Sequence, residues 1–187
     1  LFKLVSEFRK YDSSIPIVLM GYMNPIEAYG FDNFVDKLVD SKIDGLLIVD
    51  SPPEESVILN KYLTKYKKSH IYLASPTTTD QRMKNISKMS SGYVYYVTIK
   101  GITGSKLSNV SSIRKNVNKI KKYSHNNLPV AVGFGIKDSS SAKKMATFSD
   151  GIIIGSSIVE LIHKYSNNEK KMNNKLSTYI SSISNVI

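Results

Sequence analysis

Two glycine-rich turns in the last third of the chain could together bind a phosphate group. Each closes a short apolar run: one is Gly133-Phe134-Gly135-Ile136, and the other is Gly155-Ser156-Ser157 after residues 151–154. If the second turn opens a helix, its first N–H groups, the positive helix end and the Ser156 hydroxyl would face one phosphate. The alternative is a tight turn whose glycine only permits a positive φ. Because both of the last two apolar runs end in such turns, the phosphate site is favoured.

A second group of residues joins a tyrosine-rich strand to a glycine-containing loop. Tyr93 and Tyr95 alternate along the strand, so both rings are expected on one of its sides. The loop that follows, residues 100–109, contains Thr103 and Gly104 and has few apolar anchors. We expect it to open and close over a ligand. The alternative is that the two tyrosines are ordinary strand formers on a half-buried surface.

The composition excludes several kinds of chemistry. The 187 residues contain no cysteine, which rules out disulfides, thiolate metal sites and a cysteine nucleophile. The three histidines lie far apart in the sequence, so no metal site is expected. The net charge of +11 comes mostly from scattered lysines, since only three of 26 basic residues are arginines. This pattern favours lysine-rich, solvated helix faces over a nucleic-acid-binding surface. No apolar run reaches the roughly 18 residues of a membrane span.

Short apolar runs that alternate with amphipathic stretches predict an α/β fold. The runs are continuously apolar, as in parallel strands that are covered on both faces. We expect strands at residues 15–20, 45–49, 71–74, 93–97, 129–132 and 151–154. We expect helices at residues 31–39, 54–67, 80–89, 111–123, 139–147, 157–165 and 170–187, and caps at Thr79-Asp80 and Asp138-Ser139.

Six βα units are compatible with an open doubly wound sheet or with part of a closed barrel. Glycine turns after the last two strands favour the TIM (βα)8 barrel, which needs eight units in roughly 250 residues. We therefore expect residues 1–187 to form a single partial barrel domain that lacks the first two units. Leu1 lies within a helical pattern without a cap or an initiator methionine, which also indicates a fragment.

Motifs along the whole chain resemble the α subunit of tryptophan synthase, in the same order and spacing. They are Pro16–Pro25, Asp44–Ser56, Ala74–Asp80, Gly92–Gly104, Pro129–Ile136 and Asp150–Val159. The resemblance implies a lyase that splits indole-3-glycerol phosphate into indole and glyceraldehyde 3-phosphate. Gly21 and Ser51 depart from the family pattern, and both are expected in loops, where they would affect partner affinity more than the fold.

The resemblance also implies roles for individual residues. Phosphate binding falls to Gly104, Gly135, Gly155 and Ser156, while Tyr22 and Leu47 flank the indole, Phe134 lines the pocket and Thr103 lies in the substrate-binding loop. Tyr95 is expected beside the reacting centre as a supporting residue and not as the base.

The family's two catalytic carboxylates precede every residue of this chain. They are a glutamate at the end of the second strand and an aspartate in the loop after it. Glu54 and Glu55 cannot replace them, because they are expected to open a helix after Pro52-Pro53, where the helix dipole favours acidic residues. No catalytic residue is therefore assigned in this chain, and the chain alone is expected to be inactive.

Two proline-containing loops are expected to contact a partner. They are residues 21–29 and 50–54, with Asn24, Asp50 and Pro52 as the contact residues. The resemblance implies a tryptophan synthase β subunit in an alpha-beta-beta-alpha tetramer. The chain is expected to need no cofactor of its own, because pyridoxal phosphate belongs to the β subunit. A cytoplasmic location is expected, or the plastid stroma for a plastid-encoded protein.

Two other functions are considered at this point. Another phosphosugar barrel enzyme, such as an isomerase or an aldolase, would need a lysine or a carboxylate at a strand end, and Lys100 is the nearby candidate. A non-catalytic subunit that binds and regulates a partner is the third interpretation.

Overall fold

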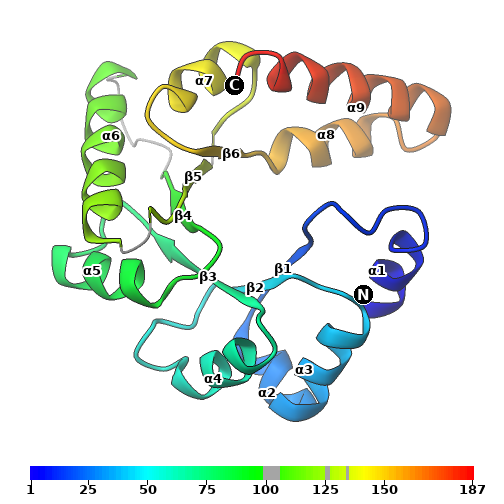
Figure 1. The fold of residues 1–187 in the computed structure, drawn as a ribbon. Helices are drawn as coiled ribbons and strands as arrows, with labels where there is room; N and C mark the ends of the chain where they lie inside the picture. The colour runs from blue at the N-terminus through cyan, green and yellow to red at the C-terminus, as the bar shows by residue number, and fades with distance from the viewer. Residues whose placement is uncertain (99–105, 125–126, 134) are drawn as a thin grey trace.

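Six parallel strands form the centre of the molecule and are arranged in chain order (Figure 1). A computed structural model describes residues 1–98, 106–124, 127–133 and 135–187. The strands are β1 (Val18–Gly21), β2 (Gly45–Ile48), β3 (Ser69–Ala74), β4 (Val94–Val97), β5 (Val130–Gly133) and β6 (Gly151–Ile153). Every neighbouring pair is parallel, and the strands curve into a half-barrel with β1 and β6 at its two edges. The predicted α/β barrel architecture and all six strands are confirmed.

The helices lie on the outer side of the curved sheet. They are α1 (Phe2–Phe8), α2 (Met23–Tyr29), α3 (Phe31–Asp40), α4 (Val57–Lys65), α5 (Asp80–Met89), α6 (Lys106–Tyr123), α7 (Ser139–Ala146), α8 (Ser156–Lys164) and α9 (Glu169–Ser184). None of the helices in the described part of the chain is long and apolar enough to cross a membrane.

Two helix boundaries differ from the sequence prediction for local reasons. The predicted helix at residues 54–67 begins only at Val57, because Pro52 and Pro53 are followed by a turn in which the Ser56 N–H donates to the Pro52 carbonyl. Glu54 and Glu55 therefore precede the helix and do not open it. The helix predicted at 111–123 begins earlier, at Lys106.

The two predicted helix caps are confirmed. The Thr79 side chain accepts a hydrogen bond from the Arg82 N–H at the start of α5. Asp138 and Ser141 form a reciprocal capping box at the start of α7. These caps bind N–H groups that an α-helix cannot satisfy internally.

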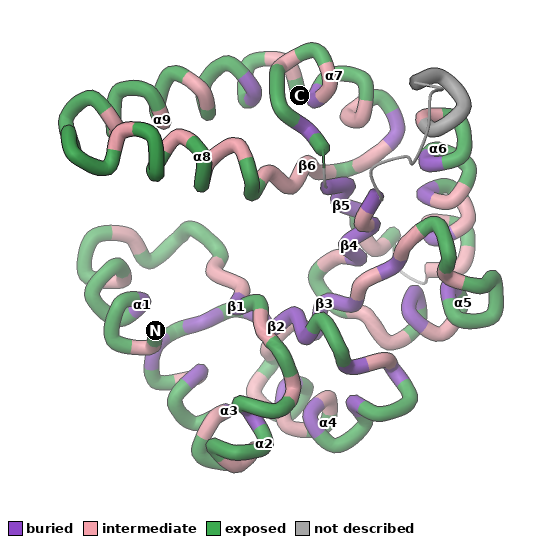
Figure 2. The backbone as a smooth tube through the Cα atoms, turned by 180° about the vertical axis from the view of Figure 1, so that it is seen from behind, coloured by how far each residue is buried: buried purple, intermediate pink, exposed green. Residues whose placement is uncertain are grey.

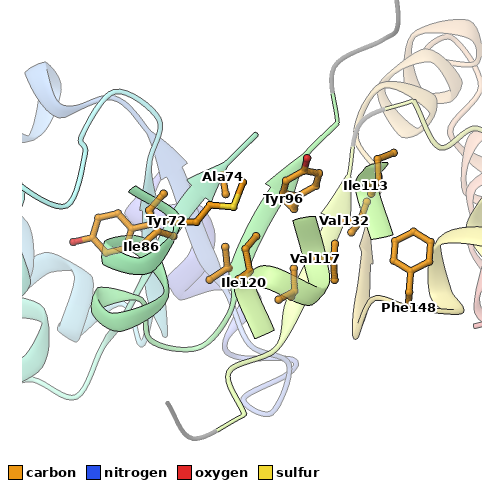
Figure 3. Packing of buried hydrophobic residues seen from close by; sticks show 12 residues of the cluster. Tyr72, Ala74, Ile86, Tyr96, Ile113, Val117, Ile120, Val132 and Phe148 are labelled. Atoms are coloured by element: carbon orange, nitrogen blue, oxygen red, sulfur yellow. The ribbon is translucent and has the colours of Figure 1, made fainter. Parts of the chain in front are cut away.

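The largest cores lie between the sheet and its helices. Figure 3 shows one of them, where Tyr72 and Tyr96 on β3 and β4 pack against Ile86 of α5 and Ile120 of α6. A second core joins β1 and β2 to α1, α2, α3 and α4, and a smaller one joins β6 to α7 and α9. Figure 2 shows buried positions along the strands, whereas α8 contains no buried residue.

Candidate functional site

The inner face of the sheet carries a small apolar cluster that runs along the strands. Leu47, Ile71 and Tyr95 are its buried members, from β2, β3 and β4. Val18, Leu73, Tyr93, Val97 and Ile153 pack against them. The structure therefore brings together two residues predicted for the substrate pocket, Leu47 and Tyr95, from strands that are separated by β3.

The Tyr95 ring lies directly against Gly133, the last residue of β5. A Cβ atom at Gly133 would lie 2.6 Å from the Tyr95 hydroxyl oxygen and 2.9 Å from the Ile153 Cβ. Burial raises the pKa of Tyr95, and the neighbouring Tyr93 adds to this effect, so the phenol stays protonated at neutral pH. Gly133 thus makes room for Tyr95. The sequence prediction missed this role, although a glycine at the end of a strand is a signal of close approach.

Gly155 caps the N-terminus of α8 and faces open space. Its φ and ψ are −122° and −71°, and no atom of the described residues lies within 4 Å of the position that a Cβ would occupy. Neither a positive φ nor packing within the chain therefore requires a glycine here. The next residues, Ser156 and Ser157, carry the first N–H groups of the helix, which an α-helix leaves without an internal acceptor. An anion above α8 could approach the backbone closely at this point.

Gly135 differs from Gly155 in the reason for its glycine. Its φ is +81°, which is the left-handed region that other residues rarely adopt. A turn conformation alone accounts for this glycine. Phe134, Thr103, Gly104 and Lys100 lie outside the described residues. Residues 106–109, which the sequence predicted in a mobile loop, instead begin α6.

Residues 21–29 do not form the loop that the sequence predicted, since Gly21 is the last residue of β1 and pairs with Ile48. Residues 23–29 are helix α2, and Asn24 and Pro25 lie in its first turn. That prediction was wrong because proline is tolerated in the first turn, where its missing N–H is not needed. Tyr22, predicted to flank the indole, is the N-cap residue of α2 and is 60% exposed.

Asp50 connects the two segments that were predicted to contact a partner. Its Oδ1 accepts a hydrogen bond of 2.8 Å from the N–H of Met23, the first residue of α2. Asp50 therefore caps α2 from the loop after β2, while Pro52 in the same loop is half-buried. The three predicted contact residues, Asn24, Asp50 and Pro52, lie on adjoining segments at the same edge of the sheet.

No carboxylate of the described residues belongs to the inner-face cluster, which consists of apolar and tyrosine side chains. Glu54 and Glu55 are exposed in the loop before α4. The Glu54 carboxylate accepts a hydrogen bond of 3.0 Å from the Asn85 side chain, which lowers the pKa of Glu54. Both carboxylates lie outside the inner-face cluster, so neither is placed to transfer a proton to a ligand held by Tyr95.

Comparison with known families supports one identification over the full chain. The family model described as "Tryptophan synthase alpha chain" matches residues 1–187. The tryptophan synthase alpha chain of Psychrobacter cryohalolentis is 45% identical over 158 residues, which are 84% of this chain and 57% of that protein. That of Marinobacter nauticus is 44% identical over 92% of this chain and 63% of its own length. The chain thus spans about three fifths of these relatives.

Solved structures agree with the sequence comparison. The tryptophan synthase alpha chain of Legionella pneumophila is 34% identical, with a TM-score of 0.82 over 99% of this chain and 69% of that chain. A chain of the tryptophan synthase a2b2 complex from Pyrococcus furiosus is 30% identical, with a TM-score of 0.85 over 99% of this chain and 73% of that chain.

Proposed function

The chain belongs to the tryptophan synthase alpha chain family, and from this premise we propose that it holds indole-3-glycerol phosphate for cleavage into indole and glyceraldehyde 3-phosphate. The observation that carries the proposal is Gly155. Its Cβ position is open, and it is the N-cap residue of α8, two residues after the end of β6 at Ile153. Because glycine has no side chain, a phosphate can approach the backbone there more closely than any other residue type would allow.

The contacts between β4, β5 and β6 support one ligand that meets both the proposed phosphate site and the pocket wall. Gly133 on β5 pairs with Ile153 on β6, and Tyr95 on β4 packs over Gly133. A ligand whose phosphate meets Gly155 and Ser156 would therefore extend along the inner face toward Tyr95 and Leu47. The apolar Leu47 suits an indole ring, and the protonated Tyr95 offers a hydrogen-bond donor beside it.

The cleavage itself is a retro-aldol reaction that needs proton transfer. A general acid and base tautomerise the indole, and a base removes the glycerol hydroxyl proton as the carbon–carbon bond breaks. Tyr95 and Leu47 position the substrate but do not move these protons. The 187-residue chain alone therefore releases no measurable indole, because general acid–base catalysis contributes about 10²–10⁴-fold per group. Steady indole formation by the purified chain would contradict this part of the proposal.

A tryptophan synthase beta chain is the proposed partner, in an alpha-beta-beta-alpha tetramer. Support comes from the family and from Asn24, Asp50 and Pro52, which lie together at the edge where the strands end. Indole is apolar and would diffuse away, so a mouth that closes against a second subunit retains it. The chain needs no cofactor of its own, and pyridoxal phosphate belongs to the partner.

Ligand binding tests the proposal directly. Calorimetric titration with indole-3-glycerol phosphate is expected to show binding that Gly155→Asp abolishes, because a carboxylate would occupy the phosphate position. Gly155→Ala is the matched control for the fold, since its Cβ would meet no atom in the part of the chain that the structure describes. It should leave the unfolding temperature unchanged. Equal affinities of Gly155→Asp and the unaltered chain would remove Gly155 from the site.

Another phosphosugar enzyme is not favoured, because the family model covers all 187 residues and the solved structures share the fold throughout. A role limited to regulating a partner is distinguished by the same titration, since it requires no binding of indole-3-glycerol phosphate.

A further inference from the structure

The end of β5 is held by two hydrogen bonds from one residue, Thr98. Thr98 directly follows β4, and its backbone N–H donates to the Gly133 carbonyl over 3.0 Å. The Thr98 hydroxyl donates to the same carbonyl oxygen over 3.1 Å. A carbonyl oxygen has two lone pairs, so it can accept both bonds. Thr98 is 6% exposed, so water competes little for this contact.

The backbone bond is an ordinary part of the sheet, whereas the hydroxyl bond is an addition. The pair of β1 and β2 shows the difference. Val49 directly follows β2, and its N–H donates over 2.9 Å to the carbonyl of Gly21, the last residue of β1. In both strand pairs, the accepting glycine is aligned with the last residue of the neighbouring strand. Valine has no hydroxyl, so the ladder can end without a side-chain bond, and a β-branched apolar residue is accepted at this position.

Gly133 lies between the two parts of the proposed ligand site. On the β4 side, the Tyr95 ring occupies the space that a side chain at Gly133 would take. On the β6 side, Gly133 is aligned with Ile153, two residues before Gly155. The position of Gly133 therefore affects the distance between the Tyr95 ring and the start of α8. A ligand that contacts both ends depends on this distance.

Thr98 acts on this geometry from the other side of the sheet. Its neighbour Val97 packs against the inner-face cluster, and successive side chains of a strand point to opposite faces. The Thr98 hydroxyl therefore does not line the pocket. Its effect on a ligand passes through the Gly133 carbonyl.

We propose that Thr98 is a positioning residue for ligand binding, because its hydroxyl fixes the end of β5 between Tyr95 and the proposed phosphate site. The inference rests on the proposed function and deepens it with a residue outside the pocket on which the ligand depends. Without the hydroxyl, only the backbone bond holds the Gly133 carbonyl, as at Gly21. The affinity for a ligand that reaches from β4 to β6 then falls, although the chain is folded.

Calorimetric titration with indole-3-glycerol phosphate, at a temperature where the variants are folded, tests the inference. Thr98→Val removes the hydroxyl and keeps the β-branched shape that Val49 has at the equivalent position. Its Kd is expected to rise about fivefold, as for the loss of one hydrogen bond. Thr98→Ala also lacks the hydroxyl and should weaken binding as well, which keeps the test open if valine does not pack. Thr98→Ser keeps the hydroxyl, and its Kd should stay within about twofold of the unaltered chain.

Ser87→Ala is the matched control for a merely structural role. The Ser87 hydroxyl is also buried and donates to a backbone carbonyl, that of Met83 in α5, over 2.7 Å. Its removal should lower the unfolding temperature, as the removal of the Thr98 hydroxyl does, because each change breaks a buried hydrogen bond. The Kd of Ser87→Ala should nevertheless match that of the unaltered chain.

The outcomes separate the inference from the proposed function. Equal Kd values for Thr98→Val and the unaltered chain would overturn the inference and leave the proposed function standing. Equal weakening by Thr98→Ser or by Ser87→Ala would overturn it too, because the contact of the Thr98 hydroxyl with Gly133 would then not be the cause. Absence of binding by the unaltered chain would overturn both the inference and the proposed function.

Discussion

The two edges of the sheet use their polar groups in opposite ways. Where strands begin, the carboxylates of Asp44 and Asp150 each accept a backbone N–H of the neighbouring strand segment and pair with a cation. Where strands end, Gly155 faces open space, and the Glu27 and Glu55 carboxylates have no partner among the described residues. The first edge holds the strands together, whereas the second is the edge at which barrel enzymes generally have their sites.

The two aspartates at the starting edge make equivalent contacts, but the cations that pair with them differ in exposure. Asp44 Oδ2 accepts hydrogen bonds of 2.7 Å from the Ile17 N–H and from Arg9 Nη2. The Arg9 side chain is 5% exposed and also donates to the carbonyls of Ile15 and Lys42. One arginine therefore connects α1, the segment before β1 and the segment before β2.

Asp150 makes the same kind of contacts before β6, but its cation is a lysine that is more exposed than Arg9. Its Oδ2 accepts a hydrogen bond of 2.9 Å from the Val130 N–H, and its Oδ1 lies 2.7 Å from Lys121 Nζ. The Lys121 side chain is 36% exposed and, among the described residues, donates to no backbone carbonyl as Arg9 does. Solvent screens this pair, so it should contribute less to the stability of the fold than the Arg9 cluster.

The largest effect is expected at Gly133, which ends β5 and touches the pocket wall. Gly133→Ala would place a Cβ 2.6 Å from the Tyr95 hydroxyl and 2.9 Å from the Ile153 Cβ, so side chains must shift. We expect a loss of about 3 kcal/mol in the free energy of unfolding. Urea unfolding followed by circular dichroism measures it. A variant as stable as the unaltered chain would show that Tyr95 moves aside without cost.

Arg9→Ala should come next, with a loss of about 2 kcal/mol, because it removes the cation from Asp44 and the donor from three backbone carbonyls, those of Asp12, Ile15 and Lys42. Lys121→Ala is the matched change at the other aspartate and should cost less than about 1 kcal/mol. Unfolding of both variants at one pH and salt concentration tests the comparison. Equal losses of stability would show that the difference in exposure between Arg9 and Lys121 does not matter.

His70 should make the fold sensitive to acid. It is buried at the beginning of β3, its Nδ1 has no hydrogen-bond partner among the described residues, and burial lowers its pKa from 6.5 to about 4. Because the unfolded state binds the proton more readily, the stability contributed by neutral His70 is full above pH 6.5 and is lost as the pH falls toward 4. We expect a loss of about 2 kcal/mol between pH 7.5 and pH 5.

His70→Leu provides the control for this pH dependence. It should unfold with a flatter pH profile between 7.5 and 5, whatever its stability at pH 7.5. Parallel profiles of the variant and the unaltered chain would exclude His70 as the cause.

The smallest effect on stability is expected for Asp50, which caps α2 and also lies on the proposed partner surface. Asp50→Ala removes the acceptor for the Met23 N–H and should cost about 1 kcal/mol in stability. Asp50→Asn keeps an acceptor oxygen and should cost much less, while both variants weaken beta-chain binding. Loss of stability without any loss of binding would limit Asp50 to its capping role.

The strands and their arrangement in a barrel followed from the sequence. Continuous apolar runs such as Gly45–Ile48 are buried throughout, as is typical of strands covered on both faces. Helix ends were predictable where a polar cap stood at the right spacing, as at Thr79 and Asp138. The loop predicted at Asn24-Pro25 was wrong, because proline starts helices as readily as it shapes loops.

Only the tertiary structure decided the contacts between segments that are far apart in the chain. The fit of Tyr95 over Gly133, the two aspartate clusters, and the hydrogen bonds from Thr98 to Gly133 each join different βα units. The sequence by itself determined the type and order of the elements, because local periodicity records which faces are buried. It did not determine these contacts, because the curvature and register of the sheet decide which loops and side chains meet.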